Sequence, residues 1–252
     1  MNIIVAFKVV PDDQDIQVAA DGSLDASKAP QKVSEYDLNA IEAAAQLAAA
    51  NEGSQVFAVT VGGSRIDDSK LKKNVMARGA DKLFMVADDA AADLDSHATA
   101  AALADLIGTV GDYDVIICGD GSADIFAQQV DVQLAYKLGI PSVNSVISLE
   151  AGAGAITARR KLEDVIETVE LPLPCLVAVT PDIALPRIPG MGDILKAGKK
   201  PMEVSGAANA YANVTETISV KAPEQVDRKL DVKDAAEDGA IEAFAAAIKV
   251  AL

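Results

Sequence analysis

The stretch "VIICGDGSADIFAQQVDVQLAYKLGIP", residues 115–141, joins an apolar run, a turn of small polar residues and an amphipathic segment. The run from Val115 to Cys118 has the apolar, β-branched character of a buried strand. The segment 124–138 has helical character and stops at Gly139-Ile140-Pro141. We therefore predict a strand, a polar turn and a helix, which is the repeating unit of α/β proteins.

Further apolar runs of strand length repeat this unit along the chain. They cover residues 2–10, 55–61, 82–87 and 175–180. Ala-rich amphipathic segments separate the earlier runs and predict helices. These cover residues 35–50, 64–79 and 95–111. We place Asp37 in a first turn, Gly79 just past a helix end and Ser96 at an N-cap. Strands alternating with helices predict an α/β fold with a doubly wound, mostly parallel sheet and Rossmann-type layering.

Three segments depart from that alternation. Residues 142–180 have the pattern of antiparallel strands around a Gly-Ala turn, followed by one more core strand. Residues 181–201 are rich in proline and predict a restricted loop rather than a regular element. From about Ser205 the apolar periodicity fades until an aliphatic helix at the end of the sequence. We predict one domain over residues 1–204 and a C-terminal arm over 205–252.

Composition excludes several classes of function. The formal net charge of −16 over 252 residues disfavours binding to nucleic acid or to an anionic membrane, since both need a basic surface. No apolar stretch reaches the length of a membrane span, and "MNIIVAFKVVP" reads as a first strand rather than a signal peptide. Cys118 and Cys175 lie in apolar runs and are expected to be buried free thiols. We therefore expect a cytoplasmic protein.

Small and polar residues follow several of the predicted strands. Ligands of doubly wound sheets bind outside the carboxyl ends of the strands. Suitable residues there are Ala6 to Lys8, Val61-Gly62-Gly63 and Gly119 to Gln129, with Ser34 to Asp37 at a helix start. Glycines allow close backbone approach, and helix N-termini attract phosphate. These groups predict a nucleotide site; the alternative is that they form ordinary strand-to-helix turns.

The polar side chains of these segments have complementary abilities. Asp37 or Asp124 could accept hydrogen bonds from ribose hydroxyls or an adenine amine, and Gln128 and Gln129 can both donate and accept. Neither a G-x-x-x-x-G-K-[ST] loop nor a G-x-G-x-x-G motif is present. Ordinary ATPases and Rossmann dehydrogenases are therefore disfavoured.

Catalytic groups are scarce in the sequence. His97 is the single histidine, and it stands at a predicted helix start, where a capping or packing role competes with that of a general base. We find no Ser-His-Asp arrangement, no cluster of metal ligands and no activated cysteine. The prediction is a protein that binds a ligand, has no metal and is not an enzyme by itself.

Several stretches together resemble one family, the beta subunit of electron transfer flavoproteins, in its FixA-type branch. They are "VVPDDQDIQV", "DGSLDASKAPQKVSEYDLNAIEAA", "GDGSADIFAQQV", "LGIPSVNSV", "ARRKLEDVIETVELPLPCLVAVT" and "PRIPGMGDILKAGKKP". The resemblance covers nearly all of residues 1–204, in order. It implies the adenine-nucleotide alpha-hydrolase-like variant of the fold.

The resemblance also implies cofactors. Such subunits pair with an alpha subunit that holds most of the redox-active FAD, and they bind a second nucleotide themselves. That nucleotide is AMP in simple carriers and FAD in bifurcating members. By this likeness the cofactor-binding residues are Ala6, Ser34, Glu35, Tyr36, Asp37, Val61, Gly119, Asp120, Gly121, Ser122, Ala123, Asp124, Ile125, Phe126, Ala127, Gln128, Gln129 and Val130. One departure concerns Ser34, because many relatives carry an Asn-Pro pair before the aromatic residue and the acid of this helix.

Partners follow from the same resemblance. Residues 182–200 correspond to a partner-docking loop with Met191 as its anchor, assisted by Arg187 and Ile188. The partner would be a dehydrogenase or a quinone-linked oxidoreductase, and the arm 205–252 would pack on the alpha subunit. Arg159 and Arg160 are further candidates for contact with that subunit, or are solvated charges. The alternatives are a bifurcating beta subunit that binds FAD and a nucleotide-binding stress-type sensor.

Overall fold

The computed structural model describes residues 1–224 and 232–251. The chain divides into two compact units. The first contains Met1–Gln17 and Asp25–Ser219, and the second contains Val18–Leu24 and Val220–Leu252. The first unit contains the large sheet and the candidate site described below.

A nine-stranded sheet organises the first unit, in the order β11-β10-β9-β12-β8-β1-β6-β7-β13. The strands from β9 to β13 along this order run parallel to one another. They are β1 (Asn2–Ala6), β6 (Gln55–Gly62), β7 (Lys82–Ala87), β8 (Val115–Gly119), β9 (Ser142–Ala151), β12 (Cys175–Val179) and β13 (Met202–Ser205). The predicted mostly parallel sheet is confirmed.

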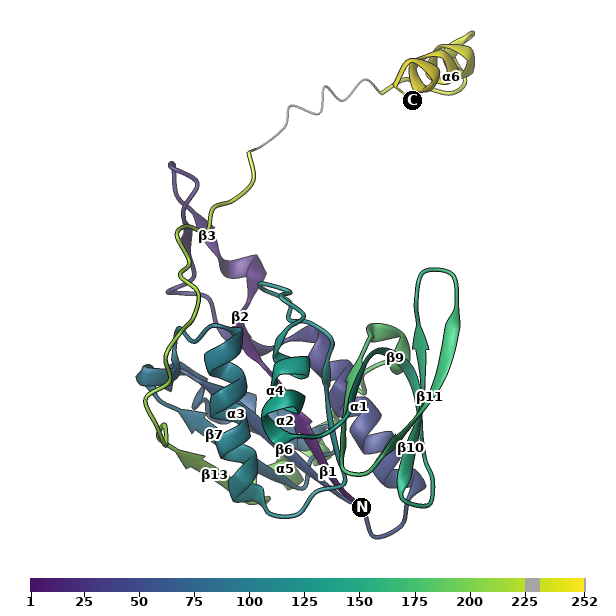
Figure 1. Cartoon of the computed structure of the whole chain (residues 1–252). Coiled ribbons are helices and arrows are strands. Elements are labelled where there is room, and N and C mark those ends of the chain that lie inside the picture. Colours follow the sequence, from purple (N-terminus) through teal and green to yellow (C-terminus); the bar gives the residue numbers. More distant parts are fainter. Residues whose placement is uncertain (225–231, 252) are drawn as a thin grey trace. The chain divides into compact units, whose positions relative to one another are not determined.

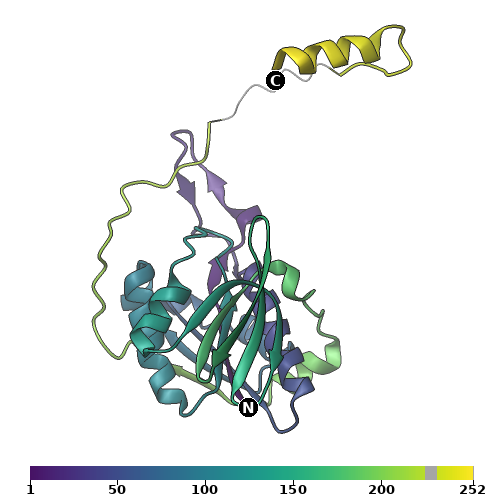
Figure 2. The same cartoon turned by 45° about the vertical axis from the view of Figure 1, so that its right-hand side comes forward.

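Antiparallel strands extend one end of this sheet. β10 (Ala155–Lys161) pairs antiparallel with both β9 and β11 (Ile166–Pro172). These strands lie together in Figure 1 and face the viewer in Figure 2. The antiparallel excursion predicted over residues 142–180 is therefore confirmed, and β12 is the core strand that follows it.

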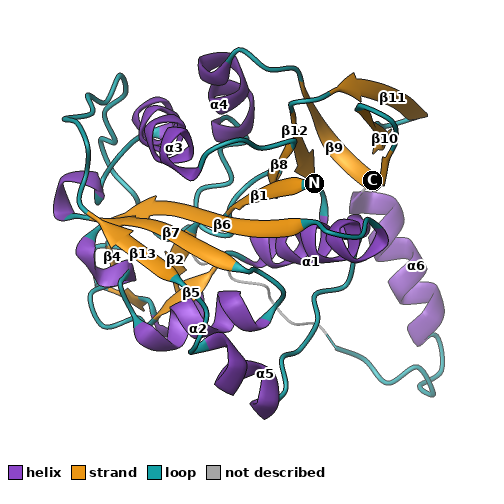
Figure 3. Ribbon diagram, turned by 90° about the horizontal axis from the view of Figure 1, so that it is seen from below, coloured by secondary structure: helices purple, strands orange, loops and turns teal. Residues whose placement is uncertain are grey.

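Helices cover both faces of the sheet (Figure 3). α1 (Glu35–Ala50) and α2 (Ser69–Ala77) lie on one face, with α5 (Met191–Ala197) against α2. α3 (Ser96–Val110) and α4 (Val130–Leu138) cover the other face. α6 (Ala240–Ala251) belongs to the second unit. None of the helices in the described part of the chain is long and apolar enough to cross a bilayer.

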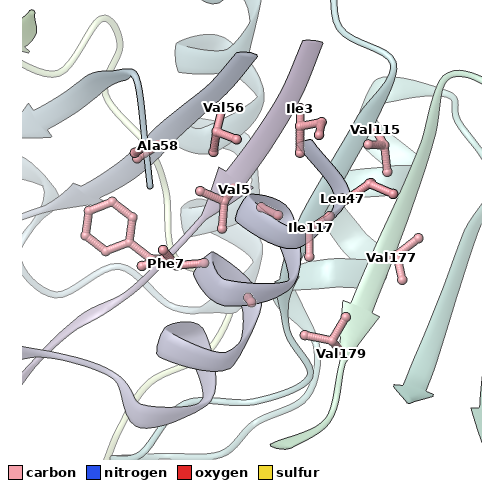
Figure 4. Close-up of a cluster of buried hydrophobic side chains, with 14 of the residues drawn as sticks. Ile3, Val5, Phe7, Leu47, Val56, Ala58, Val115, Ile117, Val177 and Val179 are labelled. Atoms are coloured by element: carbon pink, nitrogen blue, oxygen red, sulfur yellow. The ribbon is translucent and has the colours of Figure 1, made fainter. Parts of the chain in front are cut away.

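Two aliphatic cores follow from the period of two along each strand. In β1, Ile3 and Val5 pack on the α1 side, whereas Ile4 and Ala6 pack on the α3 side. Figure 4 shows the first of these cores, where Leu47 of α1 lies over the strands. Because both faces are buried, the strands read as continuous apolar runs.

The order of the strands creates a switch point between β1 and β8. The chain proceeds from β1 through α1 to β6 and through α2 to β7, moving away from β8. α3 then returns the chain to the opposite side of β1, where β8 is added. Carboxyl ends of strands on either side of such a reversal frame a crevice, which is the usual ligand position in this architecture.

Short strands complete the described elements. β2 (Val9–Pro11) pairs antiparallel with β5 (Gln31–Val33), and β3 (Gln17–Val18) forms a two-stranded sheet with β4 (Leu24–Asp25). Two predicted helix positions are confirmed. Asp37 lies in the first turn of α1, and Gly79 directly follows Arg78, the cap residue at the end of α2.

Some predicted helix boundaries are wrong. The helix expected from Asp124 begins only at Val130, because Phe126 and Gln128 have left-handed φ values of 51° and 53°. Asp95, not Ser96, caps α3 by accepting a hydrogen bond from the Ala98 amide at 2.8 Å. The loop expected over residues 181–201 contains helix α5, whose first residue is Met191.

Candidate functional site

A cleft of about 1330 Å³ opens at the switch point between β1 and β8. Its floor contains Ala6, Val61 and Gly119, each at or near the carboxyl end of a parallel strand. The start of α3, the start of α4 and residues 213–217 form its walls. Ligand pockets commonly measure about 300–1,000 Å³, so this cleft has room for a nucleotide.

Most of the predicted cofactor-binding residues line this cleft. They are Ala6, Asp37, Val61, Gly119, Asp120, Gly121, Ser122, Asp124, Ile125, Ala127, Gln128, Gln129 and Val130. The others lie just outside its lining: Ser34, Glu35, Tyr36, Ala123 and Phe126. Ser34 accepts a hydrogen bond from the Ala123 amide at 3.2 Å, and the rings of Tyr36 and Phe126 pack with centroids 5.0 Å apart. These contacts fix the loop that the lining residues share.

Asp37 ties the ends of the two strands at the switch point together. Its carboxylate accepts from the Lys8 amide at 2.7 Å and from the Gly119 amide at 2.9 Å. Burial raises the pKa of Asp37 to about 7, although the two backbone hydrogen bonds favour the ionised form. Since both oxygens already have backbone partners, this carboxylate supports the strand ends that line the cleft and is not a free acceptor.

Glycine is required at Gly119, and Gly121 packs closely against the movable Phe126 side chain. A Cβ atom on Gly119 would lie 2.8 Å from Asp37 Oδ1 and 2.9 Å from Tyr36 Cβ. On Gly121 it would lie 2.3 Å from the Phe126 ring. The loop therefore packs backbone directly against α1 and Phe126, and this leaves its polar backbone close to the cleft.

The loop that follows β8 is held by an ion pair across the mouth of the cleft. Lys8 Nζ lies 2.6 and 2.8 Å from the two oxygens of Asp124, and Ser122 Oγ donates to the same carboxylate at 2.5 Å. Burial would raise the pKa of Asp124, but the hydrogen bonds from Lys8 and Ser122 outweigh it and lower that pKa. Asp124 thus has protein partners of its own.

Asp120 lines the cleft and, within the part of the chain that the structure describes, carries a buried acceptor without a partner. Its residue is 9% exposed, and among the described residues its Oδ1 has no hydrogen-bond partner. Burial and the neighbouring charge of Asp131 raise the pKa of Asp120. A buried acceptor without a partner is costly, so a ligand hydroxyl or amine would be stabilised there.

The start of α4 lies beside this acceptor. The N-cap residue of α4, Gln129, makes no side-chain cap hydrogen bond, and Gln128 to Asp131 all line the cleft. The first-turn amides of a helix carry partial positive charge and attract phosphate. The start of α4, Asp120 and the glycines at the strand ends are therefore the groups that could hold a ligand with a phosphate and a hydroxyl or amine.

Sequence reasoning missed part of the lining. Arg65, Asp89, Thr99 and residues 213–217 all face the cleft. Arg65 follows the Gly62-Gly63 pair at a strand end, so its place in the cleft could have been predicted from the sequence. Residues 213–217 have no hydrophobic periodicity that would have indicated theirs. His97 also lines the cleft but is exposed. Within residues 1–224 and 232–251, no group of three or more His, Cys, Asp or Glu could hold a metal ion.

The predicted docking loop lies away from the cleft and is firmly attached. Arg187 contacts buried Glu42 of α1 through Nε at 2.6 Å and Nη2 at 3.0 Å, and its amide donates to the same carboxylate at 3.2 Å. Asn39 of α1 donates to the Ala184 carbonyl at 2.7 Å. Burial would raise the pKa of Glu42, but the hydrogen bonds of Arg187 outweigh it and lower that pKa.

Large apolar side chains project from this attached loop. They are Leu185, Ile188, Met191 and Leu195. Met191 is 78% exposed and Ile188 is 92% exposed, although both are large hydrophobic residues. A fixed backbone that exposes several apolar side chains is typical of a protein-docking surface.

One family model matches the chain. Its description is "Electron transfer flavoprotein domain", and the match covers residues 21–210, from before α1 to the segment after β13. Members of that family are electron carriers that bind FAD and in some cases AMP. The matched span includes most of the cleft and the whole attached loop. The chain belongs to the electron transfer flavoprotein family.

Proposed function

We propose that this chain is the beta subunit of a heterodimeric electron transfer flavoprotein of the FixA type. The observation that carries the proposal is the cleft between the ends of β1 and β8, which includes the start of α4 and the residue Asp120, one oxygen of which has no partner in residues 1–224 and 232–251. In this role the chain binds a nucleotide, completes the environment of the partner's flavin and docks redox proteins. It contributes no general acid or base.

Distinct parts of the cleft would hold the nucleotide. The first-turn amides of α4 and the Gly121-Ser122 backbone suit the phosphate, and the free oxygen of Asp120 suits a hydroxyl or amine. The strand ends at Ala6 and Val61 suit the flat base. Tyr36 supports the loop from outside through its ring contact with Phe126. A flavin, when bound, supplies the electron-transfer chemistry of the heterodimer.

The nucleotide content of the complex tests this assignment. The chain would be co-purified with its alpha subunit and denatured, and FAD and AMP in the supernatant would be measured per heterodimer. We expect one FAD and one AMP, as in a simple carrier. Two FADs without AMP would instead identify this chain as a bifurcating subunit. A complex that contains no nucleotide attributable to this chain would contradict the proposal.

A nucleotide-binding stress-type sensor is the competing function from another class. Such a sensor needs no alpha subunit, so the isolated chain would bind nucleotide in full and would form no flavin-containing complex on co-expression. The exposed apolar side chains of α6 favour the subunit role, because Ile241, Phe244 and Ile248 recur at helical spacing. We propose that the arm packs on the alpha subunit through them.

The docking loop yields a second prediction. Replacing Met191 by alanine should raise the apparent KM for the redox partner about 5- to 20-fold with little change in kcat, because a central apolar anchor contributes about 1–2 kcal/mol. Flavin reduction would be followed against the concentration of the partner dehydrogenase, and reoxidation of the reduced flavin against the concentration of a quinone-linked oxidoreductase.

A matched control is available for that experiment. Val165 is also an exposed apolar residue, at 53%, but it lies in the turn between β10 and β11. Val165→Ala should leave the KM unchanged. Equal changes in the KM for the two substitutions, or no change for Met191→Ala, would contradict a docking role for this loop.

A further inference from the structure

Residues 206–217, here called the strap, run along α3 after the edge strand β13 (Figure 1). Polar bonds fix the strap at both ends of this path. The Ala207 amide donates to Asp88 at 3.0 Å, while Asn209 and Tyr211 both donate to Asp105 of α3 at 2.8 Å. The part beyond residue 210 lies outside the span matched by the family model.

The strongest attachment is at Asp95, the residue that caps α3. One carboxylate oxygen accepts from the Ala98 amide, as an N-cap does. The other accepts from the Val214 amide at 2.7 Å, the Thr215 amide at 2.9 Å and the Thr215 hydroxyl at 3.0 Å. These bonds lower the pKa of Asp95, with the Ala98 bond as the largest cause, so the carboxylate stays ionised at neutral pH.

Asn213 closes the attachment from the strap side. Its side-chain oxygen accepts from the Asp95 amide at 2.8 Å, and its side-chain nitrogen donates to the Asp93 carbonyl at 2.8 Å. Strap and helix start therefore hold each other through reciprocal bonds. The strap bonds that the Asp95 carboxylate accepts involve an ionised group, and bonds of that kind are about twice as strong as bonds between neutral groups.

The attached part of the strap is also a wall of the cleft. Residues 213–217 line it together with Ser96, His97 and Thr99 at the start of α3. Most strap residues are exposed, and little apolar burial holds them in place. A wall attached chiefly by polar bonds can open without disrupting the core.

We propose that the strap is a wall of the nucleotide cleft that its bonds to Asp95, here called the latch, hold closed. The latch sets how slowly bound nucleotide leaves. This inference rests on the proposed function, since it requires a nucleotide in the cleft. It adds residues 213–217 to the binding site and makes Asp95 a positioning residue that acts through them.

The test measures nucleotide release from the purified heterodimer. Labelled AMP, or labelled FAD if the complex contains two FADs, would be bound and then chased with excess unlabelled nucleotide. Asp95→Asn keeps the oxygen that caps α3 but turns an amide NH₂ toward the three strap donors. We expect release at least about tenfold faster, with faster hydrogen exchange at the Val214 and Thr215 amides.

Two further variants separate the latch from other effects. Asp105→Ala loosens the strap at a residue outside the cleft lining, so it should also speed release. Asp68 caps α2 through the Leu71 amide at 2.8 Å and does not line the cleft, so Asp68→Asn should leave release unchanged.

The outcomes are distinct. Unchanged release from both the Asp95 and Asp105 variants, or unchanged exchange of the strap amides in them, would overturn the latch. Faster release from the Asp95 variant without faster exchange of the Val214 and Thr215 amides would show direct ligand contact by Asp95 and would also overturn it. Failure of the wild-type heterodimer to retain any nucleotide in this chain would refute the proposed function itself.

Discussion

Replacement of Gly119 by alanine should lower the free energy of unfolding by about 2–3 kcal/mol and abolish nucleotide retention. The new Cβ atom would lie 2.8 Å from Asp37 Oδ1, 2.9 Å from Tyr36 Cβ and 3.1 Å from the Tyr36 carbonyl carbon. Two of these neighbours belong to the body of α1 and cannot rotate away. Relief would require β8 and α1 to separate, which breaks the bond between the Gly119 amide and Asp37.

Denaturant unfolding and the nucleotide assay would measure both effects. Gly108→Ala is the matched control, because Gly108 lies within α3 and a Cβ atom there meets no atom within 4 Å. That control should raise the free energy of unfolding by up to about 1 kcal/mol, since alanine favours a helix. A Gly119→Ala chain of wild-type stability would contradict the close packing described for the switch point.

The second large effect concerns pH. The pKa of Asp37 is about 7 in the folded chain, because burial disfavours its charge, against the ordinary value of 3.8. The folded chain therefore binds more protons than the unfolded chain between about pH 4 and pH 7. The stability that Asp37 contributes is fully present below pH 4 and is lost as the pH rises through 7. Each rise of one pH unit between about pH 4 and pH 7 lowers the free energy of unfolding by up to about 1.4 kcal/mol.

Asp37→Asn removes this titration while keeping the size of the side chain. The free energy of unfolding of this variant would be measured by denaturant titration from pH 4 to pH 8. It should not show the decrease with rising pH that Asp37 causes in the wild type. The difference between wild type and variant should thus change with pH by an amount on the order of 3–4 kcal/mol. Parallel curves over this range would mean that Asp37 ionises as freely in the fold as in the unfolded chain.

Much of the fold could be predicted because burial on both faces imposes a simple pattern. Runs such as residues 115–118 are apolar without interruption, and only a strand covered by helices on both sides needs that composition. The carboxyl ends of these strands could then be assigned to one edge of the sheet, which located the cleft at Ala6, Val61 and Gly119.

The missed features depend on contacts between distant residues. Residues 124–129 contain no proline or glycine, yet Lys8 binds Asp124 and Tyr36 packs on Phe126, and these contacts hold a loop where local propensity favours a helix. The strap is fixed by aspartates more than a hundred residues earlier in the chain. Neither arrangement leaves a periodic signal in the sequence.

The docking loop and the cleft depend on the same helix. Asp37, which joins β1 to β8, is followed in α1 by Asn39 and Glu42, which hold residues 184 and 187 of the loop. Because these hydrogen bonds all come from two turns of α1, the loop can shift relative to the cleft only if α1 bends or one of the bonds breaks. If a partner docks on Met191 as proposed, the load would pass through α1 to Asp37, the residue that bonds the backbone amides at the base of the cleft.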